Sequence, residues 1–94
     1  MVLNVQLCQD LGYINVPKGM IRQLSSEAES MPDEKVLVLC TGSQGEENSA
    51  LVRMAKGEVK DFMLRPGDAV LLSSHTIPGN EKAVIGMIND LIRL

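Results

Sequence analysis

The chain is poor in aromatic and cationic side chains, and each shortage limits what it can be. Its 94 residues include no Trp, one Tyr and one Phe, so a core has to be built from aliphatic side chains and Met. Nine Lys and Arg stand against twelve Asp and Glu, which gives a net charge of −3. Independent electrostatic binding to nucleic acid rests on concentrated positive charge. The composition argues against that class, but it leaves room for a patch within a larger site.

Cysteine, histidine and long apolar runs are also scarce. Cys8 and Cys40 lie in apolar runs without the spacing of a metal site or redox motif, which indicates reduced thiols in a cytoplasmic protein. His75 is the only histidine and supplies neither a metal cluster nor a nucleophile–base set. We interpret it as a solvated loop side chain. No signal peptide is predicted, and no apolar run approaches the roughly 20 residues of a membrane-spanning helix.

Three stretches have the apolar spacing of amphipathic helices. They are residues 1–12, 46–56 and 80–94. Gly12 is a natural C-cap for the first, and Gly57 is a stop for the second. Within the polar connector 18–35, Ser26 and Glu29 have the spacing of a capping box, which predicts a single helical turn.

Two apolar runs predict strands between these helices. Residues 36–40 and 69–72 are continuous runs of strand length, typical of strands that are buried on both faces of a sheet. A short strand is predicted at 13–16, and Pro66-Gly67 predicts a type II turn that Asp68 closes. Alternating strands and helices predict an α/β fold, a Rossmann-like parallel β-sheet flanked by helices, in a single domain. Because the chain ends on a helix where another strand is expected, both termini are predicted to lie inside a larger domain.

A polar loop follows the first predicted strand. It consists of Thr41, Gly42, Ser43, Gln44, Gly45 and Glu46. In a parallel sheet, ligands bind at the edge where the strands end. The glycines would let the backbone approach a ligand, and amides that open onto a helix favour an anion. The spacing matches neither the GxGxxG dinucleotide fingerprint nor the phosphate loop with its GK[ST] ending, so a plain strand-to-helix turn stays an alternative.

A second polar loop follows the neighbouring predicted strand and leads into the last helix. Ser73, Ser74 and Thr76 supply hydroxyl donors, and Asn80 can cap the helix. A well-built turn and cap is the simpler alternative here. Since both loops would emerge at the same sheet edge, the candidate ligand-binding residues are the first loop, 41–46, together with Ser73, Ser74 and Asn80.

These loops and their flanking runs also carry a family resemblance. The stretches VLVLCTGSQGE, RPGDAVLLSS and IPGNEKAV, in one register, resemble the β-CASP region of ribonuclease J, a family of metallo-β-lactamase-fold nucleases. The segments LGY at 11–13 and VPKG at 16–19 are similar to the same family upstream. The resemblance covers essentially the whole chain and implies a partial β-CASP domain, from which the metallo-β-lactamase domain is absent. His75-Thr76 and the residues after Glu46 depart from the family pattern, so His75 receives no family role.

The resemblance implies a metal-dependent ribonuclease of RNA processing and decay. Family members hold two metal ions, usually zinc, that activate water for phosphodiester hydrolysis. None of the family's metal ligands is in this sequence, so zinc is expected only in the missing domain, and this chain alone is predicted to be inactive. By the same resemblance, the two loops would face or support the RNA cleft. RNA is the implied partner, without a membrane.

Two other functions stay open. The chain could be an independent nucleotide- or phosphate-binding α/β module that uses the same loop amides, although such a module needs a complete sheet. It could also be a structural fragment that associates with itself, because cutting a parallel sheet exposes strand edges and apolar faces. Contact with the missing domain would cover the same surfaces.

Overall fold

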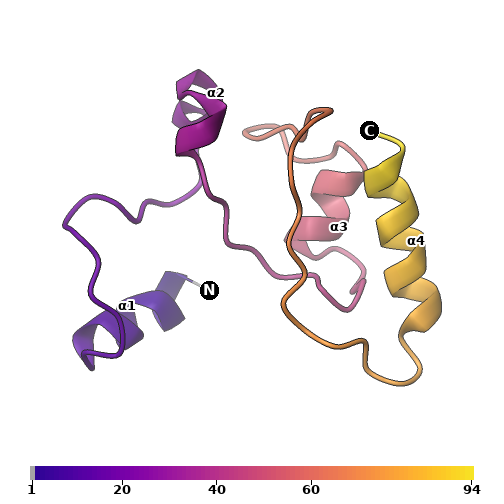
Figure 1. The fold of residues 1–94 in the computed structure, drawn as a ribbon, viewed down its shortest axis with the longest axis horizontal. Coiled ribbons are helices and arrows are strands. Elements are labelled where there is room, and N and C mark those ends of the chain that lie inside the picture. Colours follow the sequence, from indigo (N-terminus) through magenta and orange to yellow (C-terminus); the bar gives the residue numbers. More distant parts are fainter. Residues whose placement is uncertain (1) are drawn as a thin grey trace.

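A computed structural model describes residues 2–94 as helices joined by long irregular segments (Figure 1). In chain order these are α1 (Val2–Asp10), α2 (Glu27–Ser30), the 3-10 turn η1 (Asp33–Lys35), α3 (Ala50–Ala55) and α4 (Glu81–Ile92). Of the helices in this part of the chain, only α3 and α4 pack on each other. None of them has the length and apolar character that crossing a membrane requires. The molecule measures 39 × 32 × 19 Å, with α1 on the side away from α3 and α4.

The predicted parallel β-sheet is wrong, because residues 2–94 contain no strand. Residues 36–40 and 69–72 run past the helices, but no backbone hydrogen bond joins the two segments within the described chain. Residues 13–16 are also irregular. A strand exists only where a neighbouring strand supplies the ladder of hydrogen bonds. An apolar run of the right length is therefore insufficient, and the Rossmann-like α/β class is replaced by helices with irregular connections.

The segment 36–40 nevertheless keeps the alternation of an extended chain. Val36, Val38 and Cys40 are half-buried, whereas Leu37 is 87% exposed and Leu39 is 65% exposed. Successive side chains of an extended backbone point to opposite sides. One side of this segment faces the rest of the chain, and the other side, which was predicted to be buried, lies open.

The core is small and sits between α3 and α4. Leu51, Val52, Val84 and Met87 form its buried cluster. Partly buried apolar side chains that pack against this cluster are Cys40, Leu72, Ile88 and Leu91. The last residues of both predicted strands therefore reach the same core, and this places the two loops that follow them near each other. The inward face predicted for the last helix is confirmed by the burial of Val84 and Met87.

The helix stops follow local signals, as predicted. Gly12 has φ 77°, and the amide of Tyr13 donates to the carbonyl of Cys8 at 2.9 Å just past α1. Gly57, with φ 72°, lies in the same position after α3. A left-handed residue at this position lets the chain satisfy the last helical carbonyls while it turns away, and glycine adopts that conformation without steric cost.

One helix begins later than predicted, and another lacks the capping hydrogen bond that was expected at its start. The helix expected from residue 46 begins only at Ala50, because Asn48 has φ 65° and the amide of Ser49 closes a turn onto the carbonyl of Glu46 at 3.1 Å. A left-handed residue cannot continue a right-handed helix. The single helical turn predicted in the connector is confirmed as α2, but the Ser26 side chain makes no capping hydrogen bond.

Candidate functional site

The two candidate loops lie against each other beside the start of α4, and the Gln44 side chain joins them. Its Nε2 donates to the carbonyl of His75 at 2.7 Å. Its Oε1 accepts from the amide of Ile77 at 2.9 Å and from Nδ2 of Asn80 at 3.3 Å. These partners lie 31 to 36 residues further along the chain. One carboxamide therefore ties the loop after the first predicted strand to the loop after the second.

Glycine allows the first loop to sit directly on α4. Gly45 has φ 70°, and a Cβ built there would lie 2.5 Å from the carbonyl carbon of Ala83. Gly42 has φ 121°, and a Cβ there would lie 2.5 Å from Oγ of Ser49. The close approach that these glycines permit in this structure is to the chain itself. They shape the loop so that Gln44 can reach across to its partners.

Two carboxylates accept hydrogen bonds from backbone amides of the loops. Oε2 of Glu46 accepts from the backbone amide of Gln44 at 3.2 Å. Oε2 of Glu81 accepts from the amide of Gly79 at 2.8 Å. A phosphate at either position would need the same donors and would meet like charge. The groups that remain for a ligand are therefore side-chain hydroxyls and not these amides.

The hydroxyl-bearing candidates are accessible. Thr41, Ser73 and Ser74 are exposed, and Ser43 is half-buried. Nearby, the hydroxyl of Ser49 is buried without a hydrogen-bond partner among the described residues. Hydroxyls both donate and accept hydrogen bonds, so the accessible ones can contact phosphate oxygens or ribose without adding charge.

The structure thus brings together only some of the nine predicted residues. Gln44 and Asn80 touch, whereas Ser73 and Ser74 lie just before His75, which carries one of the Gln44 contacts. Two partners of Gln44, the His75 carbonyl and the Ile77 amide, were not predicted. Both partners are backbone groups, which nearly every residue carries, so the residue types in the sequence could not identify them as contacts of Gln44.

A second polar cluster lies away from the loops and ties α2 to the predicted turn. Oε1 of Glu29 accepts from the amide of Met63 at 2.7 Å, and Oε2 pairs with Arg65 at 2.6 Å. The Met63 hydrogen bond, and then Arg65, hold the pKa of Glu29 below its usual value. Glu29 belongs to the polar connector 18–35, and these two contacts fix that connector to a distant segment of the chain.

The predicted Pro-Gly turn is confirmed at this cluster. Gly67 has φ 96°, and the amide of Asp68 donates to the carbonyl of Arg65 at 3.1 Å. The Asp68 carboxylate accepts from the amide of Arg65 at 2.9 Å, as a residue that closes the turn should.

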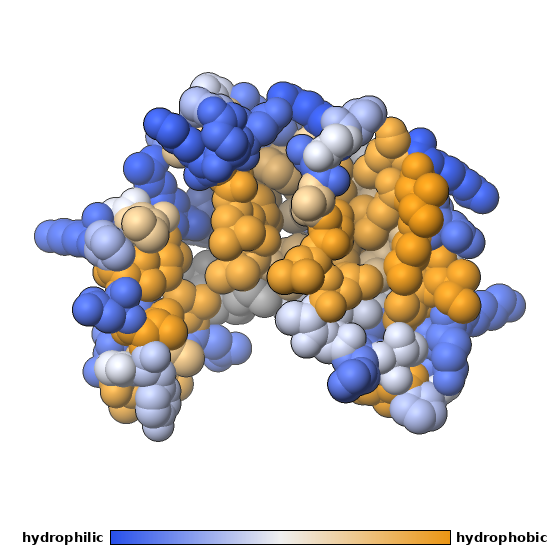
Figure 2. Space-filling view, viewed as in Figure 1, coloured by the Kyte–Doolittle hydropathy of each residue, from blue (hydrophilic) through white to orange (hydrophobic). Residues whose placement is uncertain are grey.

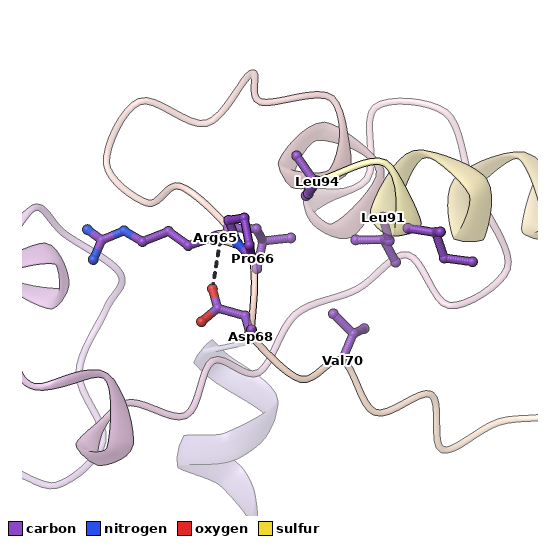
Figure 3. A pocket seen from close by; sticks show the side chains of 9 residues that line it. Arg65, Pro66, Asp68, Val70, Leu91 and Leu94 are labelled. Carbon is purple, nitrogen blue, oxygen red and sulfur yellow. Dashed lines mark hydrogen bonds between the residues drawn. The ribbon is translucent and has the colours of Figure 1, made fainter.

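An open pocket of about 290 Å³ lies between this turn and the last residues of α4. In Figure 3, Val70, Leu91 and Leu94 face one another, while the Arg65 side chain points away from them. The pocket is at the opposite end of α4 from the loop pair, which borders the start of that helix. Apolar side chains and polar groups of the turn line it together, and no metal-holding set among residues 2–94 gathers there.

The side chains of this chain do not fit a metal centre. Among residues 2–94, no three His, Cys, Asp or Glu side chains gather closely enough to hold an ion. Cys8 and Cys40 are free thiols, and burial raises the pKa of Cys40, which disfavours the thiolate that a metal would bind. No metal-dependent step is therefore assigned to these residues.

Comparison with known proteins gives the family. The sequence profile described as "Ribonuclease J, beta-CASP domain" matches residues 1–91. The chain is 42% identical to Ribonuclease J of Corynebacterium glutamicum over 94 residues, which is 100% of this chain and 13% of that protein. It is 43% identical to Ribonuclease J of Mycolicibacterium smegmatis over 94 residues, 100% of this chain and 17% of that protein. It is 41% identical to Ribonuclease J of Helicobacter pylori (strain J99) over 90 residues, 96% of this chain and 13% of that protein.

These matches show that the chain is of the β-CASP domain class. The chain belongs to the ribonuclease J family, and the resemblance found in the sequence is confirmed. It spans less than a fifth of the length of these relatives. The activity of a whole ribonuclease J is therefore carried to this chain only as a proposal.

Proposed function

We propose that this chain forms part of the RNA-facing surface of a metal-dependent ribonuclease of RNA processing and decay. The observation that carries the proposal is the Gln44 contact, which holds the two polar loops together at one end of α4. Membership of the ribonuclease J family supports RNA as the ligand. The candidate contacts are the accessible members of the nine residues, chiefly the hydroxyls of Ser43, Ser73 and Ser74.

The charge of the site limits how strongly it can bind. Glu46 lies in the first loop, Glu81 begins α4 beside the second, and the whole chain has a net charge of −3. Phosphate affinity comes mainly from Lys and Arg, whereas hydroxyl and amide contacts fix position and orientation. We therefore propose that these loops orient RNA while other parts of a longer protein supply most of the affinity.

An amide NMR titration tests this function. The labelled 94-residue chain is titrated with a short 5′-phosphorylated RNA, with inorganic phosphate and a mononucleotide as controls. We expect shifts confined to residues 41–46 and 73–80 that are larger with RNA than with either control. A folded chain whose spectrum does not respond to RNA would refute the proposal, and tighter binding of the mononucleotide would favour an independent nucleotide-binding module.

We also propose that hydrolysis depends on groups outside this chain. The donor set of residues 2–94 cannot hold a metal, and zinc is expected in a metallo-β-lactamase domain, as the family resemblance implies. We predict that the purified chain with added Zn²⁺ leaves a 5′-labelled RNA intact on a denaturing gel. Cleavage that follows the purified protein and disappears with a chelator would contradict the prediction.

A further inference from the structure

The Gln44 side chain has a role that deepens the function proposed above and rests on it. An exposed Gln in a polar loop is a plausible phosphate contact on chemical grounds. In the structure, however, its Oε1 already accepts two hydrogen bonds and its Nε2 donates one, all to the other loop. An amide oxygen has two lone pairs, so this oxygen is fully used, and a phosphate oxygen could meet Gln44 only through the second hydrogen of Nε2.

We propose that Gln44 is a positioning residue, which holds the two loops together so that the neighbouring hydroxyls can contact RNA. Ser43 directly precedes Gln44 in one loop. Ser73 and Ser74 directly precede His75, whose carbonyl accepts from Gln44, in the other loop. The carboxamide therefore sets how far the hydroxyls of the two loops stand from each other.

Two further contacts fix the first loop in the same place. The Gln44 backbone amide is held by Glu46, so the residue is bonded through both its backbone and its side chain. Gly45 meets the backbone of Ala83 within α4, while Asn80, just before that helix, donates to Gln44. The loop is thus located on α4 by one steric contact and one polar contact. A site that is fixed before its ligand arrives loses less entropy on binding.

A double-mutant cycle on RNA binding separates positioning from other roles. The 94-residue chain, Gln44→Ala, Ser73→Ala/Ser74→Ala and the combined variant are titrated with the same 5′-phosphorylated RNA. We expect Gln44→Ala and the serine pair each to weaken binding about fivefold, as the loss of one or two hydrogen bonds would. The combined variant should bind no more weakly than the weaker single variant, because misplaced hydroxyls no longer contribute.

A purely stabilising role of Gln44 would give another result. Loss of folded protein reduces binding by its own factor, so the combined variant would then be about 25-fold weaker than the parent chain. Gln44→Met keeps much of the side-chain volume without the hydrogen bonds and should reproduce Gln44→Ala. Gln23 is an exposed glutamine elsewhere in the chain, and Gln23→Ala should leave RNA binding unchanged.

NMR of the same variants without RNA gives a second measurement. In Gln44→Ala and Gln44→Met, the Ile77 amide should shift and exchange faster, while the resonances of α4 stay in place. Multiplicative losses in the cycle, or an unmoved Ile77 amide, would overturn the positioning role and leave the proposed function standing. A folded parent chain that does not bind RNA at all would instead overturn the proposed function and this inference with it.

Discussion

At the scale of single residues, the glycines differ in what a methyl group would meet. A Cβ at Gly45 would lie 2.5 Å from the carbonyl carbon and 2.6 Å from the carbonyl oxygen of Ala83, and φ is 70°. Backbone atoms of a helix cannot step aside, so the loop and α4 would have to separate. We predict that Gly45→Ala lowers the free energy of unfolding by about 1–3 kcal/mol, the usual cost of overpacking. Urea denaturation followed by circular dichroism measures it.

Gly86 provides the matched control for that substitution. It lies inside α4, and a Cβ there would meet nothing within 4 Å. Replacing a helical glycine with alanine restricts the unfolded chain and favours the helix, so Gly86→Ala should raise the free energy of unfolding by up to about 1 kcal/mol. If the two substitutions changed the free energy of unfolding by similar amounts, the close approach of Gly45 to Ala83 would not contribute to stability.

Glu29 gives a pH dependence at the same scale. Its pKa is lowered chiefly by the hydrogen bond from the Met63 amide and also by Arg65. The ionised form is therefore favoured in the folded chain. Its contribution is present at neutral pH and is lost as the pH falls through the lowered pKa. We predict that the Met63 amide resonance titrates with a midpoint below the usual value for glutamate.

Glu29→Gln tests the cause of that titration. The variant can still accept a hydrogen bond from Met63, but it cannot ionise or pair with the Arg65 guanidinium, 2.6 Å away in the structure. The acid-dependent shift of the Met63 amide should then disappear. A shift that persists in the variant would show that Glu29 is not the group that titrates.

At the scale of elements, the pairing of α3 with α4 provides nearly all the buried apolar contact. Met87 is 3% exposed in the cluster between these helices, whereas Ile85 on the same helix is 58% exposed. We predict that Met87→Ala lowers the free energy of unfolding by about 2–5 kcal/mol. Ile85→Ala should change it by about 0.5 kcal/mol or less. Equal losses in thermal denaturation would mean that the two helices do not pack as described.

Which elements could be predicted depends on how local their causes are. The stops of α1 and α3 rest on Gly12 and Gly57, whose left-handed conformation is a property of the residue itself. The strands predicted at 36–40 and 69–72 depended instead on a neighbour that pairs with the backbone, and that neighbour is not found among residues 2–94. The apolar residues of a segment predict that it will be buried, but they do not identify the element against which it will pack.

In the candidate site, too, the local features could be predicted, whereas the contacts with distant residues could not. The sequence identified the two polar loops, and both Gln44 and Asn80 were among the predicted residues. It could not assign their roles, because Gln44 binds the carbonyl of His75 and the amide of Ile77. The loops were expected to meet at the edge of a sheet. They meet instead because Cys40 and Leu72 pack against the same helical core.

At the scale of the whole molecule, much apolar surface is open. Figure 2 shows apolar side chains in several bands on a molecule that is hollowed between its two sides, with polar side chains around the outer rim. Leu37 is 87% exposed and Leu71 is 90% exposed. Monomeric soluble proteins rarely leave contiguous apolar patches of this kind uncovered. We propose that contact with another domain covers this surface in a longer protein, and that copies of the isolated chain cover it for each other.

Self-association of the chain is therefore the last prediction, and it separates apolar contact from charge. Sedimentation velocity over a range of concentrations should show a growing fraction of larger species. Leu71→Glu should reduce that fraction because it places a charge where apolar surface would be buried. Lys60 is exposed and outside the apolar segment, and Lys60→Gln changes the net charge by the same amount. If the lysine variant dissociates the larger species equally well, general repulsion explains the effect. A chain that stays monomeric at every concentration would show that the open leucines do not drive association.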